Sequence, residues 1–191
     1  MKRYFRLTKL RRLLRTFATL ILEFGVDFEA KLQDPPTAYT YRPVLIAYLN
    51  FMGVKRSGLV IAGTNFRILK PGNMTLGDYV SFGSNCSITN HGTILIGNDV
   101  MIAPGLCINT GTHDPVTLES RSTVVTIGDH VWIGSSVNII EDCVIPSGCV
   151  IGASAVVRGR FECNSLIVGN PGRCVKKLNR NATTRCWMPM N

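Results

Sequence analysis

The chain has 191 residues, of which 46% are hydrophobic and 17% are charged. This length leaves little room for two independent cores, and the apolar fraction excludes a chain that is disordered by composition. The formal net charge is +9, which bears on partners and not on the fold.

The charge is unevenly distributed along the chain. Residues 1–70 carry 13 Lys and Arg against 4 Asp and Glu, residues 71–157 carry 1 against 7, and residues 158–191 carry 7 against 1. The three segments therefore have net charges of +9, −6 and +6. An acidic middle does not fit a continuous basic surface, and the aromatic residues are not interleaved with the cations as base stacking requires. We expect no nucleic-acid partner.

Residues 1–32 are predicted to form an amphipathic helix, which Asp34, Pro35 and Pro36 close. Cations crowd its first half, and apolar residues recur every three or four positions, at Leu10, Leu14, Phe17, Ile21, Phe24 and Phe28. Such a helix either lies on an anionic membrane surface or packs its apolar side on the protein or on a partner subunit. The apolar run over residues 13–22 is too short for a membrane span, and no signal-peptide cleavage site follows it.

The seven cysteines are odd in number and contain no C-x-x-C pair. A disulfide framework is therefore poorly supported, and a reducing compartment fits better. We expect a cytoplasmic location, with peripheral attachment to the inner face of the membrane left open.

From about residue 61 the chain is built of hexads. An aliphatic or aromatic residue recurs every six positions and is usually followed by a small one, in three runs: Leu76, Phe82 and Ile88; Ile96, Ile102 and Ile108; and Ile127, Ile133, Ile139, Ile145, Ile151 and Val157. The pattern predicts a parallel β-helix whose first hexad positions point inward. The fifth positions should form a second, smaller inward row, which explains Cys86, Cys143 and Cys149 as buried small residues.

Two irregularities interrupt the hexads. Two extra residues lie between Ile88 and Ile96, and a longer break runs from Thr112 to about Val125. The longer break should project as a loop that carries His113, and a loop on a rigid solenoid is a typical place for function. We expect an N-terminal helical and transition segment over residues 1–60, a β-helix domain over 61–178 and a tail over 179–191.

The hexads occur with four ordered motifs. These are Asn109-Thr-Gly-Thr-His113-Asp-Pro115, Ile127-Gly-Asp-His-Val-Trp132-Ile-Gly134, Ile151-Gly-Ala-Ser-Ala-Val-Val157 and Val168-Gly-Asn-Pro-Gly172. With them, residues 70–178 resemble the hexapeptide-repeat acyltransferases, in the branch of the sugar and polysaccharide O-acetyltransferases. The resemblance implies a left-handed β-helix, a homotrimer with active sites between subunits, acetyl-CoA as donor, a saccharide as acceptor and no required metal.

The resemblance also implies roles for single residues. His113 matches the general base, and an imidazole with a near-neutral pKa suits that task. Asn85, His91 and Asp114 are the candidate acceptor-binding residues, although relatives often carry a carboxylate where this chain has His91. The candidate residues for acetyl-CoA are Trp132 beside the acyl and pantetheine channel, Ser135 and Ala153 at the pantetheine arm, and Arg158, Arg173 and Lys176 at the phosphates.

Three alternatives use the same repeats. A longer-chain acyltransferase could take its donor from an acyl carrier protein, because the repeats do not set donor length. A carbonic anhydrase of this fold would hold zinc through His91, His113 and His130. A binding module without activity is the third alternative. The basic N-terminal helix also departs from the maltose and galactoside enzymes, which favours a polysaccharide or a lipid-linked saccharide over a free sugar as acceptor.

Overall fold

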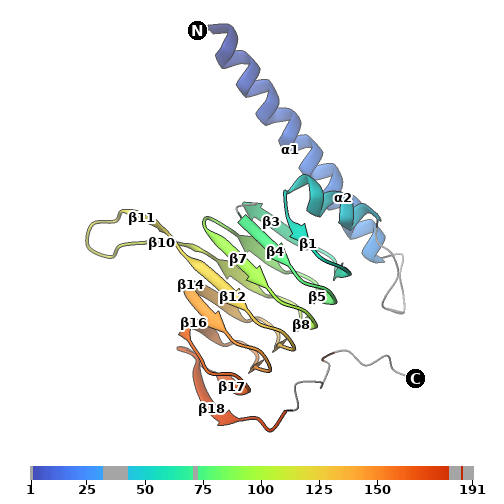
Figure 1. The fold of residues 1–191 in the computed structure, drawn as a ribbon. Helices are drawn as coiled ribbons and strands as arrows, with labels where there is room; N and C mark the ends of the chain where they lie inside the picture. The colour runs from blue at the N-terminus through green and yellow to red at the C-terminus, as the bar shows by residue number, and fades with distance from the viewer. Residues whose placement is uncertain (1, 32–42, 71–72, 181–185, 187–191) are drawn as a thin grey trace.

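The computed structural model describes residues 2–31, 43–70, 73–180 and 186, with side chains from Leu13 onward. A parallel β-helix forms the body of the molecule, and a long helix, α1 (Lys2–Lys31), rises from its N-terminal end (Figure 1). The predicted fold is confirmed. Within the described residues, no helix is both long and apolar enough to cross a membrane.

The coils of the β-helix have three faces. The first contains β1 (Lys55–Arg56), β4 (Asn73–Leu76), β7 (Thr93–Ile96), β12 (Val124–Ile127) and the second half of β14 (Asn138–Ile145). The second contains β2 (Val60–Ala62), β5 (Val80–Phe82), β8 (Val100–Ile102), β13 (Trp132–Ile133), β15 (Val150–Ile151) and β17 (Ser165–Val168). The third contains β3 (Arg67–Lys70), β6 (Ser87–Thr89), β9 (Cys107–Asn109), the first half of β14, and β16 (Val156–Arg160). Finally, β18 (Arg173–Lys177) turns back antiparallel to β17.

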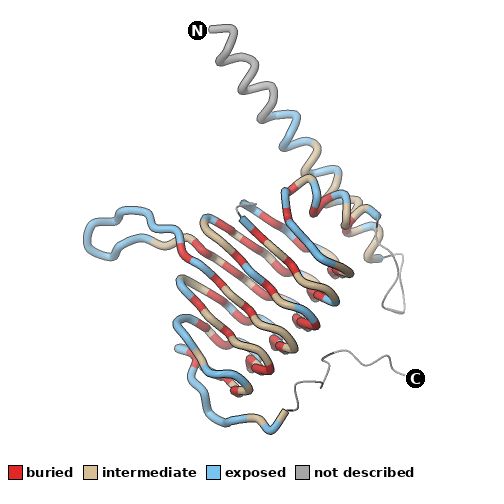
Figure 2. The backbone as a smooth tube through the Cα atoms, viewed as in Figure 1, coloured by how far each residue is buried: buried red, intermediate tan, exposed pale blue. Residues whose placement is uncertain are grey.

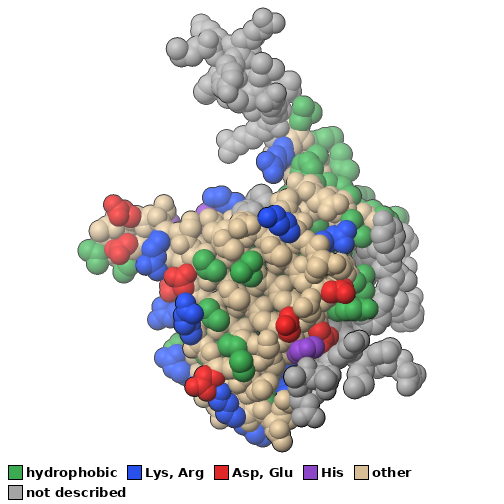
Figure 3. Space-filling model, viewed as in Figure 1, with side chains coloured by type: hydrophobic (Ala, Val, Ile, Leu, Met, Phe, Trp, Pro, Cys, Tyr) green, Lys and Arg blue, Asp and Glu red, His purple; other side chains and the backbone are tan. Residues whose placement is uncertain are grey.

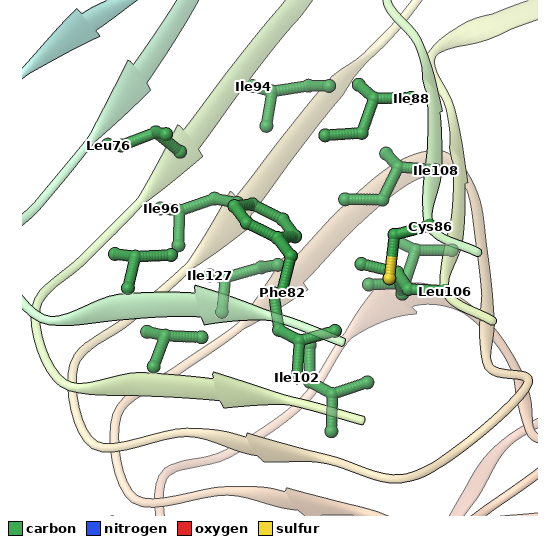
Figure 4. Close-up of a cluster of buried hydrophobic side chains, with 14 of the residues drawn as sticks. Leu76, Phe82, Cys86, Ile88, Ile94, Ile96, Ile102, Leu106, Ile108 and Ile127 are labelled. Atoms are coloured by element: carbon green, nitrogen blue, oxygen red, sulfur yellow. The ribbon is translucent and has the colours of Figure 1, made fainter. Parts of the chain in front are cut away.

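The hexad positions explain the core. Every predicted first-position residue from Leu76 to Val157 is buried, and buried residues recur from coil to coil along the solenoid (Figure 2). Figure 4 shows side chains of this row, such as Ile96, Ile102 and Ile127, inside the solenoid. The predicted fifth positions are buried as well. Burial raises the pKa of the Cys86 and Cys149 thiols, and raises that of Cys143 to about 12. These three cysteines are therefore small core residues.

The corners between faces share two features, one of the backbone and one of the side chains. Most fourth hexad positions adopt positive φ, for example 60° at Asn85 and 55° at His130. Third-position side chains accept backbone N–H bonds across coils. Asp78 Oδ1 accepts the N–H of Leu59 at 2.6 Å, and Asn98 Oδ1 accepts that of Asp78 at 2.9 Å. These bonds satisfy backbone donors that the strands leave unpaired, so they fix how one coil sits on the next.

The N-terminal end of the β-helix is covered by α2 (Pro43–Phe51), whose Leu45, Tyr48 and Leu49 are buried. The Tyr48 hydroxyl accepts the Ile68 N–H at 2.8 Å, which joins this helix to the third face. The helix begins with proline, which is favourable at a first helical position. The predicted helix over residues 1–32 is α1, and the closing residues Asp34, Pro35 and Pro36 lie outside the described residues.

Coil length changes along the solenoid. Phe82 pairs with Ile102, 20 residues later, whereas Ile133 pairs with Ile151, 18 residues later. The two extra residues near Thr93 lie in the turn between β6 and β7, as expected for an insertion that a turn absorbs. Because β1 pairs with β4, the solenoid also includes residues 55–60, ahead of the start expected at residue 61.

Candidate active site

The interruption in the hexads forms a hairpin that projects from the corner between the third and first faces (Figure 1). Its strands are β10 (Gly111–His113) and β11 (Ser120–Ser122), paired antiparallel with His113 opposite Ser120. At the tip, Asp114 Oδ1 accepts the N–H groups of Val116 and Thr117 at 2.8 and 2.9 Å. These two bonds lower the pKa of the Asp114 carboxyl. Asp114 therefore orders the tip, and its predicted role in acceptor binding stays a prediction.

A buried polar network holds the base of the hairpin. Thr110 precedes the hairpin and Thr123 follows it, and both side chains are buried together with Asn90. Thr110 Oγ1 donates to Asn90 Oδ1 at 2.9 Å and accepts the N–H groups of His91 and Gly92 at 2.8 and 2.9 Å. Thr123 donates its backbone N–H and its hydroxyl to the Thr110 carbonyl, at 2.8 and 2.9 Å. Satisfied buried networks of this kind are rigid, so the hairpin starts from a fixed base.

His113 is exposed at the end of β10, and its ring is oriented by the hairpin itself. Nδ1 lies 2.9 Å from the Leu118 carbonyl oxygen. A carbonyl only accepts hydrogen bonds, so Nδ1 carries the proton of the neutral ring, and Nε2 of that neutral ring has the free lone pair. The hairpin thereby presents the tautomer that a general base requires.

His91 lies directly beside this hairpin. Its ring packs over Gly111, where a Cβ atom would come within 2.7 Å of Cδ2. Lys70, from the coil before, places Nζ 3.0 Å from Nδ1 of His91. Because an ammonium only donates, Nδ1 is the acceptor and the proton of the neutral ring is on Nε2. Lys70 and His91 together present hydrogen-bond donors beside Gly111, which precedes His113 by two residues.

The other candidate residues lie elsewhere on the solenoid. Asn85 is exposed at the corner between the second and third faces, where its Oδ1 accepts the Asn65 Nδ2–H at 2.9 Å. Ser135 and Ala153 are exposed at the same corner, in later coils, and the Ser135 carbonyl accepts the Ser154 N–H at 2.8 Å. Trp132 is about half exposed on the second face, between Met101 and Val150.

The cations predicted for the CoA phosphates lie in the last coils. Arg158 is exposed and pairs with Glu141 at 3.3 Å. Arg173 and Lys176 are exposed on β18. Within one chain, His113 and the pair of Ser135 and Ala153 therefore occupy the two different corners that bound the third face.

One pair of residues was not predicted as a site. His130 Nδ1 lies 2.8 Å from Oδ2 of Asp99, whose side chain is almost fully buried. The tail reaches this pair, because the Cys186 N–H also binds Asp99 Oδ2, at 2.7 Å, and Arg180 lies 3.5 Å from the His130 carbonyl. Both Asp99 and His130 are fourth hexad positions in adjacent coils, so their pairing could have been found by aligning coils. Among the described residues, no three or more His, Cys, Asp and Glu side chains are grouped so that they could hold a metal ion.

Comparison with known proteins identifies the repeats. Residues 125–159 match the family model described as bacterial transferase hexapeptide (six repeats). Over 129 residues the chain is 34% identical to WbbJ of Escherichia coli K12, a protein named as a lipopolysaccharide biosynthesis O-acetyltransferase; the match covers 60% of this chain and 62% of that protein. Over 107 residues it is 36% identical to the galactoside O-acetyltransferase of the same strain, covering 53% and 51%.

The resemblance to hexapeptide-repeat sugar O-acetyltransferases is confirmed. The chain spans only about half to three-fifths of the length of these two relatives. Solved hexapeptide-repeat structures share the fold. A maltose O-acetyltransferase from Clostridium difficile 630 superposes with a TM-score of 0.61 at 23% identity, covering 87% of this chain and 89% of that one. A galactoside acetyltransferase in complex with coenzyme A gives 0.55 at 22% identity, covering 86% and 81%.

Proposed function

We propose that the protein is an O-acetyltransferase that moves an acetyl group from acetyl-CoA to a saccharide hydroxyl, with His113 as general base. The observation that carries this proposal is the bond between His113 Nδ1 and the Leu118 carbonyl, which leaves Nε2 free to accept a proton. The names of the hexapeptide-repeat relatives support the reaction class. Acetyl-CoA supplies the acetyl group as a thioester.

The proposed step is one acyl transfer. His113 Nε2 removes the proton of the acceptor hydroxyl while its oxygen attacks the thioester carbonyl carbon. A C–O bond forms, the C–S bond breaks, and the imidazolium returns the proton to the leaving sulfur. General-base catalysis of this kind contributes about 10² to 10⁴ in rate.

Exposed groups of the chain suit the two substrates. The guanidinium groups of Arg158 and Arg173 and the ammonium group of Lys176 are exposed in the last coils, where they can bind phosphates. At the corner between the third and first faces, Lys70 and His91 offer hydrogen-bond donors to an acceptor substrate held near His113. We infer a saccharide with acceptor or anionic groups there, such as a polysaccharide or a lipid-linked saccharide.

We also propose that each active site forms between neighbouring subunits of a homotrimer. Within one chain, His113 lies at a different corner from Ser135 and Ala153, the candidate residues for the pantetheine arm. A neighbouring copy can bring the second corner against the first. Light scattering tests the mass, which should be three times the chain mass of 21.0 kDa.

The activity is tested by incubating the full chain with acetyl-CoA and a panel of nucleotide sugars, lipid-linked saccharides and simple sugars. Free CoA is separated and measured by chromatography, because exposed cysteines would react with thiol dyes. With an active acceptor, His113→Ala should reduce the rate by about 10² to 10⁴, whereas the matched histidine control His130→Ala should keep it. A fully active His113→Ala variant would refute the mechanism.

Subunit mixing tests the shared site. The His113→Ala chain and a chain with Arg173→Glu and Lys176→Glu should each be inactive alone. Co-expressed, they should regain part of the activity, because some sites then combine an intact His113 with intact phosphate-binding cations. If the mixed oligomers stay inactive, the site does not lie between subunits.

A further inference from the structure

Helix α1 packs against the protein through one side. Val26 on this side is buried, and Gly25 faces a methyl group of Val44 so closely that a Cβ atom would come within 2.7 Å of it. The Glu29 carboxylate accepts the N–H groups of Val44 and Leu45, at 3.3 and 3.1 Å, and so caps the N-terminus of α2. This side of α1 therefore has a partner within the chain.

The opposite side of α1 is apolar and uncovered. Seven side chains, each 56% to 75% exposed, form what we call the α1 stripe: Leu13, Leu14, Phe17, Leu20, Ile21, Phe24 and Phe28. At 3.6 residues per turn they fall within an arc of about 120° that runs over four turns. Figure 3 shows hydrophobic side chains following α1 beside the body of the molecule.

The positive and negative charges of α1 lie in different halves of the helix. Seven Lys and Arg lie within the first 15 residues of the chain, and the first acidic residue is Glu23. All three carboxylates of the helix are engaged by the rest of the protein. Glu23 accepts the Tyr48 hydroxyl at 3.3 Å, Asp27 accepts the Asn65 N–H, and Glu29 caps α2. The helix therefore offers a cationic N-terminal half and an apolar stripe that no described residue covers.

We propose that α1 lies in the surface of an anionic lipid bilayer, with the α1 stripe inserted among the acyl chains. Amphipathic helices with this pairing of apolar and cationic residues bind at the interface by apolar burial and by attraction to anionic headgroups. The α1 stripe could instead contact the α1 stripe of a second copy of the chain. Two parallel α1 helices side by side would, however, bring the seven cations of one helix close to the seven cations of the other. Charge complementarity therefore favours the anionic lipid. This inference is independent of acetyl transfer.

The test is co-sedimentation of the full chain with vesicles. One set contains phosphatidylcholine only, and the other contains phosphatidylcholine with about one third phosphatidylglycerol. The protein should bind the anionic set at least about tenfold more tightly, and binding should weaken as salt is raised. Phe17→Gln with Phe24→Gln should reduce binding at least about tenfold, because two aromatic side chains no longer leave water.

Two further variants complete the design. Lys9→Gln, Arg11→Gln and Arg12→Gln together should remove the preference for anionic vesicles while leaving the stripe in place. Leu69→Gln with Val175→Gln is the matched control, because these apolar residues are 62% and 58% exposed on strands of the β-helix. Its binding should equal that of the unmodified chain. Circular dichroism and the oligomeric mass are measured for every variant, and Leu13→Gln with Leu20→Gln replaces the phenylalanine pair if that variant fails to fold.

Two results would overturn the proposal. One is that the unmodified chain sediments with neither vesicle set, and the other is that the stripe variants bind as tightly as the control. If the unmodified chain binds neither vesicle set and the stripe variants change the oligomeric mass, the α1 stripe belongs to a contact between subunits.

Discussion

The network at the base of the hairpin leads to a prediction about two chemically identical substitutions. Thr110→Val and Thr123→Val each replace a buried hydroxyl by a methyl group of similar size, so neither leaves a cavity. The Thr110 hydroxyl accepts two backbone N–H groups and donates to Asn90. The Thr123 hydroxyl donates only to the Thr110 carbonyl, which keeps the Thr123 N–H as a second partner at 2.8 Å. The two substitutions should therefore differ in cost.

The magnitudes follow from the donors left without a partner. In Thr110→Val the His91 N–H loses its acceptor, while the Gly92 N–H keeps Asn90 Oδ1 at 3.2 Å. An unsatisfied donor costs about 1 to 3 kcal/mol and an ordinary hydrogen bond contributes about 1 kcal/mol, so we expect a loss of about 2 to 3 kcal/mol. Thr123→Val removes one hydrogen bond and leaves every backbone group of the network with a partner. Its cost in stability should therefore be about 0.5 to 1.5 kcal/mol.

Urea denaturation at one fixed protein concentration measures both values. In a thermal scan, Thr110→Val should lower Tm by roughly 4 to 12 °C, since 1 kcal/mol corresponds to about 2 to 4 °C in a chain of this size. The rate of acetyl transfer by the Thr110→Val variant should also fall, because the polar network that positions the hairpin carrying His113 is disturbed. Equal costs for the two variants, or a larger cost for Thr123→Val, would refute this account of the network.

Three further predictions concern single groups. Cys143 should resist alkylation by iodoacetamide at pH 8 while exposed Cys163 reacts within minutes, because burial raises the pKa of Cys143 to about 12; mass spectrometry of the labelled peptides decides, and equal labelling would contradict its core position. The pKa of Asp114 is lowered by its bonds to the hairpin tip, so this carboxylate stabilises the tip above about pH 4, the ordinary Asp value, and loses that contribution as pH falls through its lowered pKa. The Val116 amide resonance should therefore titrate with a midpoint below about 3.9, and Asp114→Asn should abolish that titration; a midpoint at or above the ordinary value would contradict the tip geometry. Lys70→Met should raise KM for the acceptor about tenfold or more with little change in kcat, because a charge-assisted donor contributes about 1.5 to 3 kcal/mol to binding; an unchanged KM would show that Lys70 does not bind the acceptor.

The period of six in the sequence was sufficient to predict the solenoid and its core. Each coil repeats the same local geometry, so a residue such as Ile133 is buried for the same reason as Ile127 and Ile139. A projecting loop was predictable as well, because it interrupts a strict repeat, and its motif pointed to His113; the pairing of β10 with β11 in that loop was not predicted. The orientation of the His113 ring was not, since it depends on the folded position of the Leu118 carbonyl.

What the sequence alone determined is therefore whatever depends on local period: the strands, the inward rows and the place of the hairpin. Only the tertiary structure decided which residues meet across coils, because that register depends on whether a coil has 18 or 20 residues and on where the hairpin is inserted. Lys70 reaches His91 in this way. Tertiary structure also decided which side of α1 is covered. An amphipathic pattern shows that a helix has an apolar side, but only the contacts with α2 show that the apolar stripe faces away from the protein.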